Sequence, residues 1–400
     1  MSKPIPRVQR SPHLPSSFPA ELSDAIIDYL HDDIHSLGTC ALVCKRWLPS
    51  SRYHLFGRVT VSPKNVGKLV ELLQSPLSTI PQVSHMRMYL IQSAKQFDDT
   101  LSSLSSLTPL RSVHSLSLNQ VILESTTKAI ISQPAFGAVA ELKLEEVRFG
   151  EFHHFVDFMS GFSLLETFVV KHLSWRMDTH LSAVWWTTPS TLRVLDLDLC
   201  PVVGILKWLR LCPPIPPIHT VRFRGLTTPW LSGIQCFLRE IGPSLQHLSL
   251  TYHSSHNERM TGNELCRHLD LSHNCALRSI DLDMTLHQLF LPLSPLVKGT
   301  PLLLSRITSL VTEEVIFRLL LHSFEDINSL DWHHLERVFA LPQFLRLRRI
   351  HCELGYTADE DVAKGWRNTI TANLPACHAR GILQIAVVSL PDTTPQSSQK

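Results

Sequence analysis

The sequence predicts a mixed α/β fold in which a few N-terminal helices precede an open stack of repeats with one curved parallel sheet. Two patterns support this prediction. One apolar spacing recurs at a nearly constant interval along most of the 400 residues, whereas the N-terminal part carries apolar residues at helical spacing. The composition agrees, because 44% hydrophobic residues suffice for a buried core and 18% charged residues are too few for a disordered chain.

Charge and cysteine content exclude several classes of protein. The 37 basic and 35 acidic residues leave a formal charge of +2, so no overall field attracts nucleic acid or an anionic membrane. No stretch approaches the ~20 apolar residues of a membrane-spanning helix, and no apolar run follows the basic N-terminus to form a signal peptide. Nine cysteines without paired spacing suit a reducing compartment. We therefore expect a cytoplasmic or nuclear protein.

The chain divides into five segments. Residues 1–13 and 391–400 are polar, proline-containing tails that we expect to be disordered. Residues 14–58 form a helical module, residues 59–356 form the repeats, and residues 357–390 cap them with a helix at Asp359–Asn373 and a strand at Ile382–Val388. An open stack needs such a cap to cover its last apolar edge.

Helical spacing predicts three short helices in the module. In the first, Ser17 caps the helix, Pro19 lies in the first turn, and an apolar stripe follows, formed by Leu22, Ile26, Ile27 and Leu30. The second begins at a Ser36 cap and extends to Leu48. Pro49 ends it or starts the third helix. So small a bundle is weakly stable without a neighbour.

The repeats are recognised by the pattern apolar-x-x-apolar-x-apolar. Its middle residue is, in order, Val59, Met86, Leu116, Leu142, Phe168, Leu195, Val221, Leu248 and Ile280. The steps are 27, 30, 26, 26, 27, 26, 27 and 32 residues, within the ~20–29-residue range of leucine-rich repeats apart from the two longest. Leu347-Ile350-Cys352 is a later match, and Leu304–Ile307 is a weak one.

The segments between these strands support a solenoid. Val66–Leu73, Phe152–Met159 and Ile234–Ile241 have helical spacing, as expected for the return side of each repeat. The alternative is a βα-sheet enzyme, but its glycine-rich turns are missing. The buried position after each strand, usually asparagine or cysteine, is occupied here by Val121, Val147, Leu173, Cys200, Leu226 and His253. The repeats therefore lack the hydrogen-bonded asparagine ladder.

Signatures of catalysis are absent from the sequence. It contains no GxSxG elbow, P-loop, GxGxxG, HExxH or CxxC motif, so the sequence indicates neither a known enzyme class nor a cofactor. The densest group of potential metal ligands is Cys266, His268, His273 and Cys275. Because this spacing matches no known zinc finger, we interpret the segment as a solvated loop.

Side chains between the buried strand positions project from the open face of the sheet. On that face Asp196 and Asp198 should lie opposite Arg222 and Arg224 of the next strand. Such pairs are either cross-strand ion pairs or a charged floor for a protein target, and one does not exclude the other. The candidate target-binding residues are Lys143, Lys171, Asp196, Asp198, Arg222, Arg224, Asp281 and Asp283.

The N-terminal helices resemble the F-box. The resemblance rests on Phe18-Pro19-Ala20-Glu21-Leu22, on Ile26-Ile27-Asp28-Tyr29-Leu30 and on Cys40-Ala41-Leu42-Val43-Cys44-Lys45-Arg46-Trp47. The family pattern is a Leu-Pro-x-Glu start, an Ile-x-x-x-Leu helix and a final Val-Cys-[Lys/Arg]-x-Trp, with Phe18 replacing the usual leucine here. Ser51–Phe56, Leu374-Pro375 and Arg380–Leu383 are similar to the F-box-like set of mushroom-forming fungi.

This resemblance implies a substrate receptor of an SCF-type ubiquitin ligase. In that family the helices bind a Skp-family adaptor, and through it a cullin scaffold, while the repeats hold the protein to be modified. Residues carried over to the adaptor surface are Pro19, Leu22, Ile26, Ile27 and Leu30, with Val43, Cys44 and Trp47 joining the helices and completing the face. The alternative is an interaction scaffold without a ligase, in which these helices only cap the solenoid.

Overall fold

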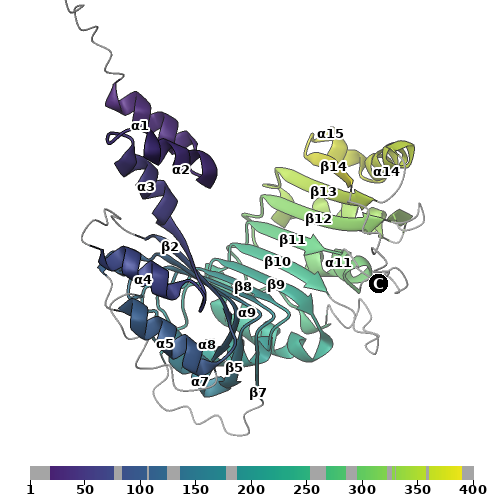
Figure 1. The fold of residues 1–400 in the computed structure, drawn as a ribbon. Coiled ribbons are helices and arrows are strands. Elements are labelled where there is room, and N and C mark those ends of the chain that lie inside the picture. The colour runs from purple at the N-terminus through teal and green to yellow at the C-terminus, as the bar shows by residue number, and fades with distance from the viewer. Residues whose placement is uncertain are drawn as a thin grey trace, which may run out of the picture.

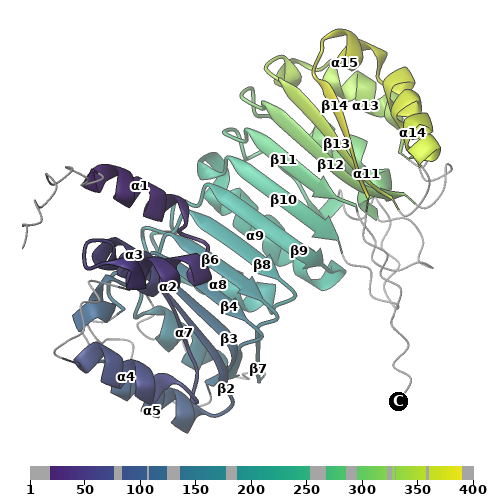
Figure 2. The same ribbon diagram turned by 45° about the horizontal axis from the view of Figure 1, so that its top comes forward.

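The computed structural model describes most of the chain. The described residues are 19–75, 83–105, 108–123, 136–176, 187–252, 267–284, 295–321, 327–328, 330–356 and 360–389. A helical module lies at the N-terminal end of a long curved sheet, and further helices line the outer side of that sheet (Figures 1 and 2). No helix among these residues is long and apolar enough to cross a bilayer.

The module consists of α1 (Ala20–Tyr29), α2 (Ile34–Val43) and α3 (Leu48–Gly57). Three helices were expected, but three details differ. Pro19 is the N-cap of the first helix and does not lie in its first turn. The second helix is capped by Asp33, whose carboxylate accepts from the Ser36 amide, so Ser36 is not the cap. The second helix also ends at Val43 rather than at Leu48, because Cys44 is extended. Ser17 lies outside the described residues.

The sheet is parallel and follows chain order from β1 to β14, with β5 and β7 beside the main path. Its strands are β1 (Arg58–Val61), β2 (His85–Ile91), β3 (Ser115–Leu123), β4 (Glu141–Glu145), β5 (Arg148–Glu151), β6 (Thr167–Lys171), β7 (Ser174–Arg176), β8 (Val194–Asp198), β9 (Thr220–Leu226), β10 (His247–Tyr252), β11 (Ser279–Asp283), β12 (Glu314–Leu321), β13 (Arg349–Tyr356) and β14 (Leu383–Ser389). This arrangement is a leucine-rich-repeat-like solenoid.

Each of the nine regular pattern matches lies on a strand, as does the later match at Ile350. The weak match at Leu304–Ile307 is wrong. Leu304 belongs to a helix that ends at Ser305, and the strand of this repeat is β12, beginning at Glu314. Thr312, fully buried, takes the first apolar position of the pattern there, which a search for apolar residues does not find.

A repeated backbone arrangement holds successive turns together. The carbonyl before one strand accepts two consecutive amides from the next turn. For example, the Ser84 carbonyl accepts from His114 and Ser115, and the His114 carbonyl accepts from Ala140 and Glu141. The same double acceptance recurs along the sheet to the Glu313 carbonyl. These bonds fix the register of neighbouring strands before any side chain is considered.

The strands end in a second repeated feature. The residue before each buried ladder position has a positive φ, namely Leu90, Gln120, Glu146, His172, Leu199 and Gly225. This left-handed residue turns the chain so that the following apolar side chain enters the core. The described ladder residues Val121, Val147, Leu173, Cys200 and Leu226 are all buried. Packing therefore replaces the asparagine ladder, as the sequence predicts; His253 lies outside the described residues.

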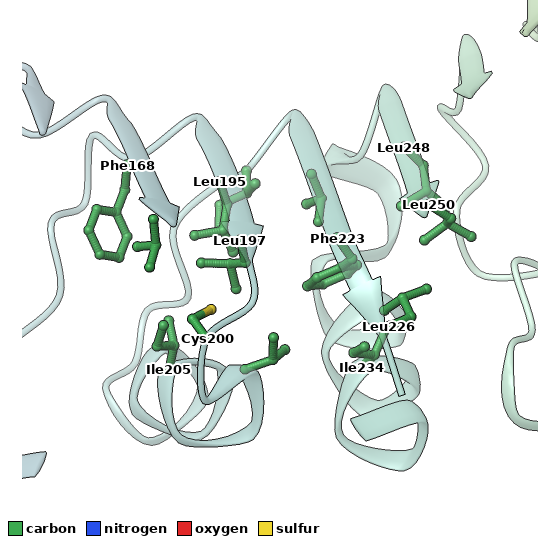
Figure 3. Packing of buried hydrophobic residues seen from close by; sticks show 14 of the residues in the cluster. Phe168, Leu195, Leu197, Cys200, Ile205, Phe223, Leu226, Ile234, Leu248 and Leu250 are labelled. Atoms are coloured by element: carbon green, nitrogen blue, oxygen red, sulfur yellow. The ribbon is translucent and has the colours of Figure 1, made fainter. Parts of the chain in front are cut away.

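One continuous hydrophobic core runs from Val59 to Ile382 between the sheet and its outer helices. Figure 3 shows its repetition, with Phe168, Leu195 and Phe223 pointing from successive strands towards the helices below. The outer helices are α4 (Val66–Gln74), α5 (Ala94–Ser105), α7 (Phe152–Met159), α8 (Val202–Leu211), α9 (Leu231–Ile241), α11 (Pro295–Ser305), α13 (Trp332–Phe339), α14 (Glu360–Asn373) and α15 (Pro375–Ala379), with 3-10 turns η1 (Thr108–Ser112), η2 (Thr228–Trp230), η3 (Gly242–Ser244) and η4 (Pro342–Phe344). The three predicted helical segments coincide with α4, α7 and α9.

The C-terminal segment adds a helix to what was expected. Pro375 does not simply stop α14 but occupies the start of the short α15. Glu336, on α13, accepts from the Ala376 amide at 2.5 Å and from the Cys377 thiol at 3.1 Å, which satisfies the first turn of α15. The predicted final strand is present as β14, which pairs with β13.

Candidate interaction surfaces

The described part of the module leaves seven of its large apolar side chains exposed. Only Ile27 and Leu37 are buried, and neither belongs to the core of the solenoid. The exposed large apolar residues are Leu22, Ile26, Tyr29, Ile34, Leu42, Val43 and Tyr53, of which Tyr29 is 87% exposed, Ile34 72% and Leu42 88%. So many exposed large apolar side chains on a small bundle indicate a site of protein interaction. These seven residues are called the module face below.

Three polar contacts, two between α1 and α3 and one just beyond both helices, hold the module together in place of a large core. Ser50 donates to Asp24 at 2.6 Å, the His54 ring lies 2.7 Å from Asp28, and Arg58 donates to Asp32 at 3.0 Å. Each pair is separated by 26 residues, so the contacts follow one another along the two helices. None of these contacts involves a residue of the module face.

The structure distributes the predicted adaptor residues over several environments. Leu22, Ile26 and Val43 lie on the module face, and Pro19 and Cys44 are also exposed. Ile27 is fully buried and supports the surface, while Leu30 and Trp47 are partly buried. Exposed Val43 and Cys44 therefore do not join the helices together as expected; they leave that role to Ile27 and Leu37.

Four residues of the module face were not among the predicted adaptor residues, namely Tyr29, Ile34, Leu42 and Tyr53. Tyr29, Ile34 and Leu42 are its most exposed members, yet they lie off the predicted apolar stripe. Tyr29 ends α1 and Ile34 begins α2, where the helical period is interrupted. The sequence feature that could have identified these two residues is an apolar side chain next to a helix end.

The open face of the sheet carries the second candidate surface. Register places Asp196 opposite Arg222 and Asp198 opposite Arg224, as predicted. Lys171 lies beside Glu145 at 3.4 Å, and Lys143 contacts Glu141 of its own strand at 2.8 Å. Charges of both signs thus alternate across the face.

Asp196 is the most buried of these charges, with a side chain only 9% exposed. Arg224 reaches diagonally to its carboxylate at 3.1 Å, and Arg222 lies 3.8 Å from the same oxygen. Burial nevertheless raises the pKa of Asp196, against the lowering effect of both arginines. One carboxylate shared by two half-exposed guanidinium groups leaves hydrogen-bonding capacity directed at solvent.

A second network surrounds Asp281 further along the face. Arg318 contacts Asp281 at 3.1 Å and Glu353 at 3.5 Å, so it connects β11, β12 and β13. Ser249 donates to Asp281, and Thr251 donates to Asp283, both at 3.3 Å. Burial raises the pKa of Asp281, although its bond to Arg318 lowers it. Arg318 was missed because β12 was not predicted as a strand, and Glu353 was not among the predicted residues although it follows the predicted match at Ile350-Cys352.

The pKa of Glu145, on β4, is shifted in the opposite direction from those of Asp196 and Asp281. Burial alone would raise its pKa, but hydrogen bonds from Asn119 at 2.7 Å and from Lys171 outweigh that effect and lower it. The eight predicted target-binding residues therefore all lie on the strands of the open face. They form separate local networks and not one cluster.

A pocket of about 220 Å³ lies where the module meets the sheet. Its walls include Asp28, His31, His54, Arg58 and His85. The His31 ring lies 2.9 Å from Asp32, which also pairs with Arg58, while His54 pairs with Asp28. Because these basic side chains already face carboxylates, the pocket offers little charge to a ligand.

No group of three or more histidine, cysteine or acidic residues in the described part of the chain is placed to hold a metal. Cys266, one of the four potential zinc ligands, lies outside the described residues. His273 and Cys275 are exposed, and the His273 ring contacts Ser272 at 3.2 Å.

The chain matches no protein-family model and no curated protein. Among solved structures it is similar to the leucine-rich repeat-containing protein LegL7 from Legionella pneumophila. The TM-score is 0.39 with 12% identity, and the match covers 80% of this chain and 98% of that chain. So low a similarity transfers no property of that protein, and the solenoid is assigned from this chain's own sheet.

Proposed function

We propose that this protein is the substrate-recognition subunit of an SCF-type ubiquitin ligase. In this proposal the module binds a Skp-family adaptor, which connects it to a cullin scaffold, and the open face of the sheet binds a protein target. The chain itself is not catalytic and acts in the cytoplasm or nucleus. Ubiquitin transfer belongs to other subunits.

The module face carries the proposal. An apolar surface of seven residues on so small a bundle is costly in water, since each buried side chain of this size contributes roughly 1.5–3 kcal/mol. The sequence motifs resembling the F-box supply several of its members, including Leu22, Ile26 and Val43. A protein partner that covers this face removes the cost.

The open face of the sheet supports the second half of the proposal. Concave solenoid faces are extended binding surfaces. The face presents half-exposed Arg222, Arg224 and Arg318, held in place by Asp196 and Asp281. Arginines positioned in this way can donate further hydrogen bonds to a partner without reorganising.

Titration calorimetry with a purified Skp-family adaptor tests the proposal. We expect wild type to bind and Ile26→Asp to lose at least tenfold in affinity, because a carboxylate then replaces an apolar contact. Leu310→Asp is the matched control, since Leu310 is 64% exposed on the solenoid, and its affinity should equal that of wild type.

Two results would contradict the proposal. One is a folded wild-type protein that does not bind the adaptor. The other is equal binding by wild type and Ile26→Asp. Absence of adaptor binding together with an intact solenoid would favour the alternative, an interaction scaffold without ligase association.

A further inference from the structure

The two edge strands of the sheet differ in length and chemistry. β1 has four residues, Arg58–Val61, and its Arg58 pairs with Asp32 of the module. β14 has seven residues, Leu383–Ser389, without a charge, a proline or a glycine. Natural proteins protect edge strands with short length, charge or a covering element. β1 is therefore protected by its short length and by charge, and α3 continues directly into it (Figure 1), whereas β14 has neither short length nor charge.

The core-facing side chains of β14 are incompletely covered. In β13 the core-facing residues Ile350, Cys352 and Leu354 are fully buried. Their register partners in β14 are Leu383, Ile385 and Val387, and these are only partly buried. The strands between β1 and β14 on the main path each have a paired neighbour on both sides, whereas no described strand follows β14. An apolar row at the end of the core therefore remains half open.

Half of the backbone hydrogen-bonding groups of β14 also face away from β13. The Ile350 amide donates to the Ile382 carbonyl at 2.7 Å, which fixes the alternation of hydrogen bonds along the parallel pair. In that alternation the amides of Gln384, Ala386 and Val388 point towards β13. The amides and carbonyls of Leu383, Ile385 and Val387 point away from it. No strand in the described part of the chain takes up these groups.

We propose that β14 pairs with β14 of a second copy of this chain, antiparallel about a twofold axis that passes beside Ala386. This register uses the whole strand and places Ile385 opposite Val387 of the other copy, so the two half-open apolar rows join. The outward-facing amides and carbonyls then bond reciprocally. A neutral strand brings no like charges together at the axis, and a twofold contact closes without forming fibres. The dimer is independent of the proposed ligase function.

Sedimentation velocity on the full-length protein tests the dimer. With rising concentration we expect the mass to increase from the 45.3 kDa of one chain towards twice that value. Ala386→Lys and Ala386→Asp each place two like charges directly across the axis and should remain monomeric at every concentration. An equimolar mixture of the two variants should regain the dimer, because the charges are then opposite.

Matched controls separate loss of pairing from loss of folding. Thr60→Lys puts the same charge on the middle of the other edge strand, where Thr60 is exposed, and should dimerise like wild type. Thermal melts of all variants should coincide with wild type at low concentration. The proposal is wrong if wild type stays monomeric, as it would if another segment of the chain covers β14. It is also wrong if Ala386→Lys still dimerises or the mixture does not.

Discussion

The helical module and the solenoid solve the problem of apolar surface in opposite ways. In the solenoid the strands up to β13 bury their core rows against neighbouring strands and the outer helices, so the core is continuous from Val59 to Ile382. In the described module Ile27 and Leu37 are the only large apolar side chains that are buried, while seven others stay exposed. The two regions are nevertheless one chain, since α3 continues directly into β1 and Phe56 packs against the solenoid core.

This difference shows where stability and where binding reside. A solenoid gains stability from each contact between neighbouring repeats, and no repeat is stable alone. The module has no comparable source of stability and depends on its attachment to β1 and on polar contacts such as Asp28 with His54. In the solenoid apolar surface is buried and stabilises the fold, whereas in the module it stays exposed and is available for binding.

The largest expected effect is in the solenoid core. Phe155, fully buried on α7, has its ring 5.5 Å from those of Phe149, Trp175 and Trp208. Phe155→Ala should lower the free energy of unfolding by about 3–5 kcal/mol, because it leaves a cavity shared by three repeats. Chemical denaturation measures the loss. A change below about 1 kcal/mol would show that the repeats are not packed as described.

A core substitution in the module should act only locally. Ile27→Ala removes one of its two buried apolar side chains and should cost the module about 2–3 kcal/mol. Amide exchange should then increase in α1 to α3, while the denaturation midpoint of the solenoid stays unchanged. A shift of the whole transition would mean that module and solenoid unfold as one unit.

The missing asparagine ladder gives a smaller effect. Val147 is buried between the equivalent residues Val121 and Leu173, all apolar. Val147→Asn places an amide among them without matching partners and should destabilise the protein by about 1–3 kcal/mol. Val147→Ala is the control for lost volume. An asparagine variant more stable than the alanine variant would indicate that the ladder can still form.

The smallest effects concern the charges of the open face. The raised pKa of Asp196 means that its ionised form weakens folding, a penalty relieved as pH falls through that raised pKa. Asp196→Asn should therefore raise the unfolding temperature slightly at neutral pH. The corresponding gain in the free energy of unfolding should be less than about 1 kcal/mol. The difference from wild type should shrink in acid.

Ionisation of Glu145, on the same face, has the opposite effect on stability from ionisation of Asp196. Its pKa is lowered, so its ionised form stabilises the fold at neutral pH, and that contribution is lost as pH falls through the lowered pKa. Glu145→Gln should lower the unfolding temperature at neutral pH. Thermal melts of both variants across the acidic range measure this contrast, and shifts of the same sign would refute it.

The regular part of the fold could be predicted from sequence because burial of a strand row needs apolar residues at fixed spacing. The prediction failed where a polar residue occupies a buried position that is apolar in the other repeats. Thr312 is buried because its hydroxyl donates to the Leu277 carbonyl at 3.1 Å, so β12 was missed together with Arg318. The short β5 and β7 have no apolar alternation and were not predicted.

The module could be predicted only in outline. Helical spacing identifies three helices, but spacing does not say whether an apolar stripe is covered by the same chain. Leu22 and Ile27 belong to one predicted stripe, yet the first is exposed and the second is buried. That outcome depends on how α1 packs on α3, which the polar pairs Asp24–Ser50 and Asp28–His54 help to fix.

Hydrogen exchange of the full-length protein, with and without a purified Skp-family adaptor, tests the division between module and solenoid most directly. Without the adaptor, amides in α1 to α3 should exchange much faster than those of β2 to β13. With the adaptor, exchange should slow across Ala20–Val43 and stay unchanged on the strands. A module already as protected as the solenoid, or unaffected by the adaptor, would contradict the account.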